Sequence, residues 1–315
     1  MNKNKNQLPM EILSRYGIHT SDITLLRETE YNAVYLVHHT PAKVLRIGYR
    51  LRQEDVQFEL DLIAFLNVAK VPIAMWNRTT DGAAFVFEPS VYTAVLFDHI
   101  EGFHPRADRE LLPNHEQACT GGKALALIHN AGKTFTTTAQ RKRTIYSELE
   151  RALGAKHILR EQYYGGEEFI SAIQSSLLFA QRYQFSPTIV HNDYRVHNVF
   201  FSSDVHINAV IDFDWSCVGP AVKDVAHAVL EWSFPDGRPE HNTALLEAFL
   251  SGYNSAAQDK VVYDQDFIDW VKFSALSDAA TYFCDRLCAE TLEKKISRSY
   301  MYKKFCYFNE RGKVQ

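Results

Sequence analysis

The sequence has no apolar run that reaches the roughly 18 residues needed to cross a membrane as a helix. Its first nine residues are polar and lack the apolar stretch of a secretory signal peptide. The five cysteines are odd in number and scattered, which is unlike the framework of a disulfide-stabilised secreted protein. These absences predict a cytoplasmic protein with no membrane partner.

A strong excess of charge of either sign is also absent. The chain carries 34 basic and 38 acidic residues, and this balance argues against a nucleic-acid partner held by phosphate contacts. A local phosphate site remains compatible with it. With 46% hydrophobic and 23% charged residues, the composition is that of a globular protein, and 315 residues suit two lobes with a core each. The oligomeric state is left open.

Two of the cysteines, Cys284 and Cys288, lie one helical turn apart and would share a helix face. A metal site there would need two more ligands at a recognisable spacing, and the sequence offers none. Buried free thiols are therefore the favoured interpretation for these two.

Short β-prone runs dominate the first third of the chain. One helical run interrupts them, because Phe58, Leu62 and Phe65 fall on a single helix face. The expected strands are residues 32–37, 43–47, 84–87 and 93–97, and the expected helix is residues 56–67.

Helical patterns dominate after Gly102. The expected helices are residues 121–129, 167–184, 224–232, 242–255 and 266 to about 294, and short strands are expected at 188–190, 198–201 and 209–213. The whole pattern predicts an α+β fold, with a small N-terminal antiparallel sheet carrying one main helix and a larger, mostly α-helical C-terminal part. We expect an N-terminal lobe at residues 1–98, a hinge at 99–102 and a C-terminal lobe at 103–315.

The most informative segment is a polar loop at residues 191–198 with apolar residues on both sides. The preceding strand delivers Asp193 and Asn198 to one place, and fourteen residues after Asn198 comes Asp212, within Ile-Asp-Phe-Asp. Phosphoryl transfer to a hydroxyl needs these residue types: a carboxylate that orients the acceptor and takes its proton, and an amide oxygen and a second carboxylate that hold Mg²⁺ against a triphosphate. Asp193 fits the base, and Asn198 and Asp212 fit the metal ligands. Each residue alone is common in turns, but the set at this spacing favours the catalytic interpretation.

The pattern His-x-Asp-x-x-x-x-Asn followed by Ile-Asp-Phe-Asp resembles the aminoglycoside phosphotransferase and choline kinase family, which has a protein-kinase-like fold. Weaker similarities lie at residues 28–37, 44–47, 95–102, 125–129 and 219–226, so the resemblance spans roughly residues 25–235. It implies a bilobal fold, ATP bound at the hinge near Leu96, Asp98 and Ile100, and a small-molecule hydroxyl or amine as acceptor. Residues 231–232 and 249–254 are loosely similar to the homoserine kinase-like branch.

The resemblance also implies supporting roles around the loop. His191 would support the loop by hydrogen bonding, since Asp193 already fills the position of a base. Asp224 would brace the loop, or it would cap the N-terminus of the helix it begins. Arg46 stands where the family has a lysine that contacts the phosphates, and Glu59 is its natural partner or a solvated helix charge.

Two departures from kinase patterns leave an alternative open. Residues 26–35 contain no glycine, although kinases usually cover the phosphates with a glycine-rich loop, and Arg46 replaces the phosphate-binding lysine. The leading prediction is an ATP- and Mg²⁺-dependent phosphotransferase that acts on a small-molecule hydroxyl. The alternative is a nucleotide-binding pseudokinase with a regulatory role. A protein kinase is disfavoured, because little chain separates Asp212 from the next helix.

Several residues near the motif have no assigned role. Asp214 is a second metal contact or faces the acceptor, and Arg195 and His197 meet substrate or phosphate or are solvated loop charges. Aromatic and acidic side chains of the helical part would suit a cationic amine, although core packing is the ordinary role of the aromatic ones. The acceptor-site candidates of this kind are Trp215, Trp232, Tyr253, Asp278, Tyr282 and Asp285.

Overall fold

The computed structural model describes residues 7–105, 113–162, 165–203, 205–234, 241–285 and 299–311. The chain forms two compact units. The first comprises residues 1–102 together with 136–142 and 208–214, and the second comprises 103–135, 143–207 and 215–315. The two short segments that return to the first unit are a feature that the sequence pattern did not indicate.

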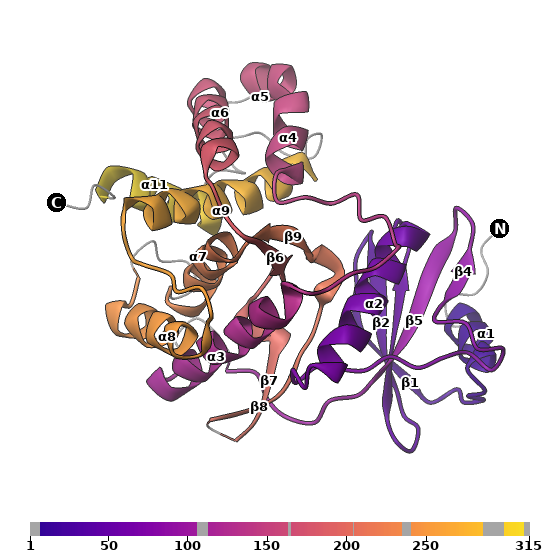
Figure 1. The fold of residues 1–315 in the computed structure, drawn as a ribbon. Helices are drawn as coiled ribbons and strands as arrows, with labels where there is room; N and C mark the ends of the chain where they lie inside the picture. The colour runs from indigo at the N-terminus through magenta and orange to yellow at the C-terminus, as the bar shows by residue number, and fades with distance from the viewer. Residues whose placement is uncertain are drawn as a thin grey trace. The chain divides into compact units, whose positions relative to one another are not determined.

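The first unit is built on a five-stranded antiparallel sheet (Figure 1). Its strands, in spatial order, are β1 (Ile23–Glu28), β2 (Asn32–Val37), β3 (Lys43–Gly48), β5 (Tyr92–Asp98) and β4 (Val86–Glu88). The register pairs Val34 with Arg46 and Arg46 with Val95, so Arg46 lies in the middle of the sheet. The sheet predicted from the sequence is therefore present, with β1 as an additional edge strand.

Two helices accompany this sheet. Helix α2 (Gln53–Val68) is the predicted one, and it buries Phe58, Leu62 and Leu66 at four-residue intervals. Helix α1 (Gln7–Arg15) was not predicted, and its Ile12 and Leu13 pack into one core with strand residues such as Leu45. A helix of nine residues has little stability of its own, so this packing is what maintains it.

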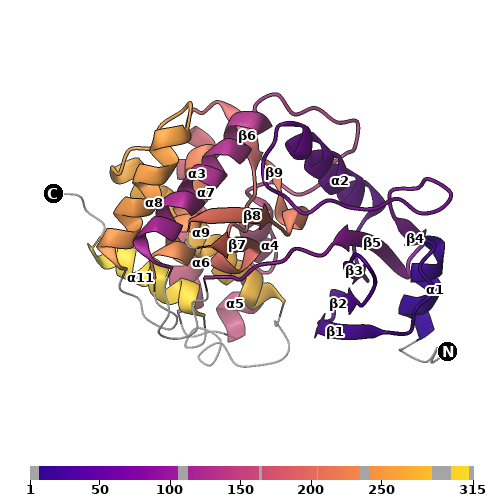
Figure 2. The same ribbon diagram turned by 90° about the horizontal axis from the view of Figure 1, so that it is seen from below.

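The second unit is mostly helical (Figure 1). Its helices are α3 (His115–Gly132), α4 (Ser147–Gly154), α5 (Lys156–Gln162), α6 (Gly166–Arg182), α7 (Ala221–Trp232), α8 (Thr243–Ala256), α9 (Gln265–Cys284) and α11 (Tyr300–Arg311). Helix α9 packs against α4, α6, α7 and α11 and buries most of its length. Helices α3 and α8 run side by side (Figures 1 and 2), and their backbones are so close that a Cβ on Gly252 would lie 2.0 Å from the carbonyl oxygen of Cys119.

Short strands lead into and away from the loop at residues 191–198. Strand β6 (Pro187–Val190) pairs antiparallel with β9 (Cys217–Pro220), which the sequence did not predict. The predicted hairpin consists of β7 (Val199–Ser203) and β8 (His206–Val210). The expected strand at 209–213 was too long, because β8 ends at Val210 and Asp212 adopts a left-handed backbone with φ of 68°.

Two other predictions, the length of the helix that begins near residue 266 and the burial of the cysteines, can be compared with the structure only in part. Helix α9 ends at Cys284, and the remainder of the helix expected up to residue 294 lies outside them, as does Cys288. The other four cysteines are free. Cys284 is only half-buried, so the prediction of a buried thiol is wrong for it. Within the described ranges, no helix is both long and apolar enough to cross a membrane.

Candidate active site

A buried carboxylate fixes the start of the polar loop. Asp224, in the first turn of α7, is fully buried, and its Oδ2 and Oδ1 accept hydrogen bonds from the backbone N–H groups of His191 and Asn192 at 2.7 and 2.8 Å. His129 Nε2 lies 3.0 Å from Oδ2. Burial alone would raise the pKa of Asp224, but the contacts with His129 and the charges of Lys223 and His191 together lower it by more and hold it well below its ordinary value.

Asp224 is therefore a brace for the loop. The alternative role as a helix cap is wrong, because α7 begins at Ala221 and Pro220 occupies the N-cap position. His191 is held inside the protein at the start of the loop. The residue is fully buried, and its ring centroid lies 5.6 Å from that of Tyr194. Its carbonyl accepts a hydrogen bond from Ser216 Oγ at 3.4 Å.

Asn192, between the supporting histidine and Asp193, has a left-handed backbone with φ of 66°. Asparagine tolerates this conformation better than most residues, and its Oδ1 accepts a hydrogen bond from the buried Lys223 Nζ. Burial lowers the pKa of Lys223 below its ordinary value. The contact with Lys223 thus holds the turn directly before Asp193.

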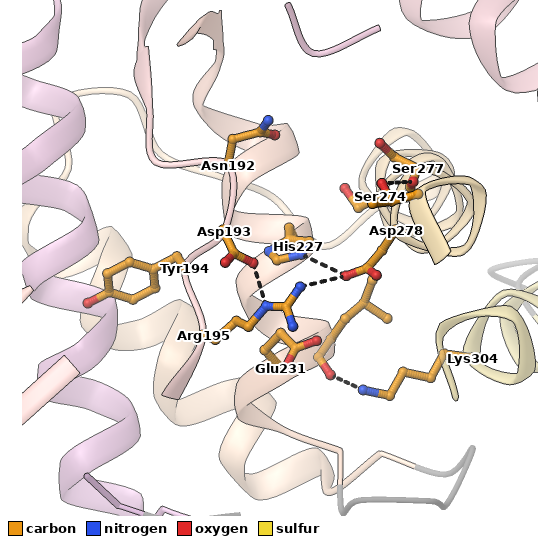
Figure 3. A network of polar contacts seen from close by, with 12 residues as sticks. Asn192, Asp193, Tyr194, Arg195, His227, Glu231, Ser274, Ser277, Asp278 and Lys304 are labelled. Carbon is orange, nitrogen blue, oxygen red and sulfur yellow. Dashed lines mark hydrogen bonds and ion pairs between the residues drawn. The ribbon is translucent and has the colours of Figure 1, made fainter. Parts of the chain in front are cut away.

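Asp193 and Asn198 are brought together by this loop. Asn198 Nδ2 donates to the backbone oxygen of Asp193 at 2.9 Å and lies 3.3 Å from Asp193 Oδ2. Arg195 Nε donates to Asp193 Oδ1 (Figure 3). Both carboxylate oxygens of Asp193 therefore have a donor within its own loop, and the side chain keeps 16% of its surface exposed.

A cavity of about 60 Å³ opens beside Asp193 in the second unit. Helix α9 contributes four polar residues at helical spacing, Ser274, Ser277, Asp278 and Thr281, which share one helix face. Figure 3 shows the first three of them. The other lining residues are Asn192, Asp193, Arg195, Trp215, Lys223 and His227. The lining thus combines carboxylates, cationic groups and hydroxyls, which suits a small polar molecule.

Two of the acceptor-site candidates from the sequence, Asp278 and Trp215, line this cavity. Asp278 Oδ2 accepts a hydrogen bond from Arg195 Nη2 at 3.0 Å and lies 3.7 Å from His227 Nε2. Burial raises the pKa of Asp278, but the charge of the Arg195 guanidinium and the contacts with His227 outweigh burial, and the pKa is about 2. Arg195 therefore has partners in the protein, and the interpretation of a solvated loop charge is wrong.

The other candidates lie elsewhere. Trp232 and Tyr253 belong to the core: Trp232 stacks on the Tyr194 ring at 5.7 Å between centroids and is fully buried. Tyr282 is half-buried beside Phe283 and is not part of the cavity lining.

Asp285, at the end of α9, is also outside the lining and pairs with Arg151 Nη2 at 2.8 Å. His197 is exposed in the short turn Val196–Asn198, with its ring 6.3 Å from that of His104.

The first unit holds the phosphate-site candidates. Arg46 Nη1 and Nη2 contact the two oxygens of Glu59 at 2.9 and 2.5 Å, and both residues are buried. Burial lowers the pKa of Arg46, but Glu59, Asp214 and Asp212 raise it by more, so it stays well above its ordinary value. Glu59 is the partner of Arg46, and its interpretation as a solvated helix charge is wrong.

The Ile-Asp-Phe-Asp segment lies next to this pair. Asp212 Oδ1 is 3.9 Å from Arg46 Nη1, and 42% of the Asp212 side chain is exposed. Arg141, from the returning segment 136–142, donates from Nη2 to the backbone oxygen of Asp214 and lies 3.5 Å from Asp55 Oδ1 in α2. No motif in the sequence marked Arg141, because its partners are distant in the chain.

The expected hinge residues differ in their availability to a nucleotide. Leu96 is buried, its carbonyl accepts from the backbone of Asn77 at 2.8 Å, and the Asp98 N–H donates to the oxygen of Met75 at 2.8 Å. Asp98 Oδ1 accepts a hydrogen bond from Lys43 Nζ at 2.6 Å. Burial raises the pKa of Asp98, but the hydrogen bonds from Lys43 and Asn77 and the charge of Lys43 together lower it below the ordinary value. Among the described residues, the backbone of Ile100 makes no hydrogen bond.

A model of the phosphotransferase enzyme family (APH) matches residues 22–261, which is well over half of the chain. The chain belongs to this phosphotransferase family. The homoserine kinase of Rhodopseudomonas palustris (strain BisA53) is 28% identical to it over 251 residues, which cover 78% of this chain and 71% of that kinase. This family membership confirms the prediction of an enzyme that phosphorylates small molecules.

Two solved kinase structures share the fold of the chain. An amicoumacin kinase in complex with AMP-PNP, Ca²⁺ and Ami has a TM-score of 0.79 at 13% identity, covering 98% of this chain and 94% of that one. A microcompartment-associated aminopropanol kinase has a TM-score of 0.67 at 21% identity, covering 97% of this chain and 96% of that one. The predicted protein-kinase-like α+β fold is confirmed, and nothing in the comparisons favours the pseudokinase alternative.

Proposed function

We propose that this phosphotransferase transfers the γ-phosphate of ATP to a hydroxyl group of a small polar acceptor, with Mg²⁺ as its metal ion. The observation that carries the proposal is the place of Asp193: its carboxylate lies in the lining of a small polar cavity and is held from both sides by donors of its own loop. A carboxylate in this setting can orient the acceptor hydroxyl and accept its proton as the phosphoryl group is transferred.

The acceptor that best fits the cavity is a small amino alcohol or hydroxy amino acid. A buried water occupies about 10–15 Å³ by this measure, so 60 Å³ holds about four to six of them, which is little room for a multi-ring aminoglycoside. The carboxylate of Asp193 suits an acceptor that carries an ammonium group beside its hydroxyl, and the hydroxyls of α9 suit further polar atoms. We place homoserine first among the acceptors, because the curated relatives with this name are up to 28% identical to the chain.

The nucleotide and the metal ion would be held by residues whose types suit them. Arg46, kept charged by Glu59, is suited to steady the phosphates, and the backbone near Ile100 is available to adenine. Asn198 and Asp212 would supply the oxygen ligands that Mg²⁺ prefers. This assignment rests on their residue types and their spacing along the chain. Mg²⁺ would neutralise charge on the transferring phosphate.

Asn198 donates from its side-chain Nδ2 to Asp193, so its side-chain Oδ1 is the atom that would bind a cation. Asp214 is an additional candidate for a metal ligand, and its carboxylate contributes to the raised pKa of Arg46.

We also propose a cytoplasmic location, since the four described cysteines are free thiols, as a reducing compartment would keep them.

The test is an ADP-release assay with Mg²⁺ and ATP against homoserine, aminopropanol, ethanolamine, choline, an aminoglycoside and a simple sugar. We expect the highest kcat/KM with a small hydroxylated amine or amino acid. Asp193→Asn should fold normally and lose about 10²–10⁴ in kcat, the usual contribution of a general base. Asp269→Asn, which alters an α9 carboxylate outside the cavity, should keep wild-type turnover. Near-normal turnover of Asp193→Asn would contradict the assignment of the base.

A further inference from the structure

Asp193 is connected to helix α9 through one arginine. Arg195 Nε donates to Asp193 Oδ1, and Nη2 of the same guanidinium donates to Asp278 Oδ2 at 3.0 Å (Figure 3). The two carboxylates lie on different elements and are separated by 85 positions in the sequence, from 193 to 278. A planar guanidinium can bridge two carboxylates in this way, because its nitrogens have a fixed geometry.

The charges around Arg195 are arranged to keep it in place. Asp278 and Asp193 both contact it, and Glu231 of α7 and Tyr300 of α11 also face it closely enough to affect its pKa. Burial lowers the pKa of Arg195, but these groups hold it well above its ordinary value, and Asp278 has a pKa of about 2. Arg195 and Asp278 are therefore both charged near neutral pH.

The same neighbourhood has the spacing of a metal site, but Arg195 already supplies its positive charge. Ligand atoms of His227, Glu231 and Asp278 lie within 4.8 Å of one another. Asp278 Oδ2 is bonded to the guanidinium, and Glu231 Oε1 accepts a hydrogen bond from Tyr300 at 3.0 Å. A dication here would have to displace the arginine, so these residues are better described as the anchor of Arg195.

We propose that Asp278 and Arg195 are positioning residues: Asp278 fixes the guanidinium of Arg195, and Arg195 fixes the carboxylate of Asp193 in the orientation that meets the acceptor hydroxyl. The proposal rests on the function proposed above. The backbone of the loop is already held on both sides of Asp193, by Asp224 before it and by the buried Tyr194 after it. What the backbone leaves free is rotation of the Asp193 side chain, and the bridge restrains it at Oδ1.

This role predicts a specific kinetic signature. Orientation of the base matters only as the proton is transferred, so loss of the bridge should lower kcat and leave the KM values for ATP and acceptor nearly unchanged. Arg195→Lys keeps the charge but offers one nitrogen in place of two. We expect a loss of about ten- to a hundredfold in kcat for it, the value of one charge-assisted hydrogen bond, and about tenfold for Asp278→Asn.

The decisive experiment is a double-mutant cycle with Arg195→Ala, Asp278→Asn and the double variant, assayed with the best acceptor found above. If Asp278 acts only through Arg195, Asp278→Asn should have almost no further effect on kcat in the Arg195→Ala background. Arg160→Lys and Asp269→Asn are matched controls, because they alter a bidentate arginine and an α9 carboxylate outside the cavity. Both controls should keep wild-type kcat.

Three results would overturn the proposal while leaving the phosphotransferase function intact. One is a raised acceptor KM with unchanged kcat in Asp278→Asn, which would make Asp278 an acceptor-binding group. Another is a loss of kcat in the double variant that equals the product of the losses in the two single variants, because Asp278 would then act independently of Arg195. The third is wild-type kcat in Arg195→Lys, which decides the matter even if Asp278→Asn does not fold. Failure of the proposed function itself would look different, since the wild-type enzyme would phosphorylate none of the acceptors.

Discussion

Replacement of Asp224 by asparagine tests how the loop is held, because the two side chains have the same shape and differ in charge and in one donor group. Oδ2 of Asp224 serves both His191 N–H and His129, and Oδ1 serves Asn192 N–H. The least costly orientation of an asparagine places its amide nitrogen at the Oδ1 position. Only the hydrogen bond to Asn192 N–H is then lost outright.

The magnitude follows from these contacts. A buried N–H left without an acceptor costs about 1–3 kcal/mol, and each of the two remaining hydrogen bonds loses about 1 kcal/mol when its acceptor becomes neutral. Asp224→Asn should therefore lower the free energy of unfolding by about 3–5 kcal/mol, a large part of the roughly 5–15 kcal/mol of an ordinary domain. A shifted loop should also lower kcat by at least tenfold, because Asp193 follows Asn192 directly.

Urea unfolding followed by tryptophan fluorescence is a suitable assay, since three of the four tryptophans, Trp215, Trp232 and Trp270, belong to the second unit. The matched control is Asp259→Asn, which removes an exposed ion pair with Lys133 at 2.8 Å and should change stability by less than about 1 kcal/mol. A loss below 1 kcal/mol in Asp224→Asn, or a loss no larger than that of the control, would refute the description of Asp224 as the brace.

Three further outcomes are expected. Glu59→Gln leaves the buried Arg46 without its close anionic partner and should cost about 3–5 kcal/mol of stability together with a higher KM for ATP; an unchanged unfolding midpoint would contradict this. Asp278 has a pKa of about 2 in the folded protein, below the value of about 3.9 in the unfolded chain. Its contribution to stability should therefore be complete above about pH 4 and be lost as the pH falls toward 2. Asp278→Asn should reduce the pH dependence of the free energy of urea unfolding over that range. Gly252→Ala places a Cβ against a backbone carbonyl of α3 and should cost at least about 1–3 kcal/mol, whereas Gly154→Ala, with open space around it, should be neutral or stabilising in a thermal melt.

Elements with a strong local pattern were predictable, and those maintained by distant partners were not. The sequence predicted β2 at residues 32–37 and the body of α2, because their apolar positions repeat at strand and helix periods. It missed β9, which has four residues, contains glycine and proline, and pairs with β6 about thirty positions earlier. It also missed α1, whose stability depends on packing against the sheet.

The residues of the candidate site also fall into those that a local pattern predicted and those that only a long-range contact reveals. Asp193 and Asn198 were predicted from their spacing, and their contact lies within one loop. The bridge from Arg195 to Asp278 spans 83 residues, so no local pattern indicated it. Trp232 was an acceptor-site candidate by its residue type, with core packing as the alternative, and the structure places it in the core.

The sequence by itself determined the class of reaction, since a short loop fixes the spacing of its polar residues whatever the rest of the chain does. Tertiary structure decided which groups surround that loop. The partner of Arg195 comes from α9, that of Asp224 from α3 and that of Arg46 from α2, and only the packing of those helices brings the side chains within hydrogen-bond distance. A contact between residues distant in sequence depends on the whole fold, and for that reason the cavity beside Asp193 and the anchor of Arg195 became visible only in three dimensions.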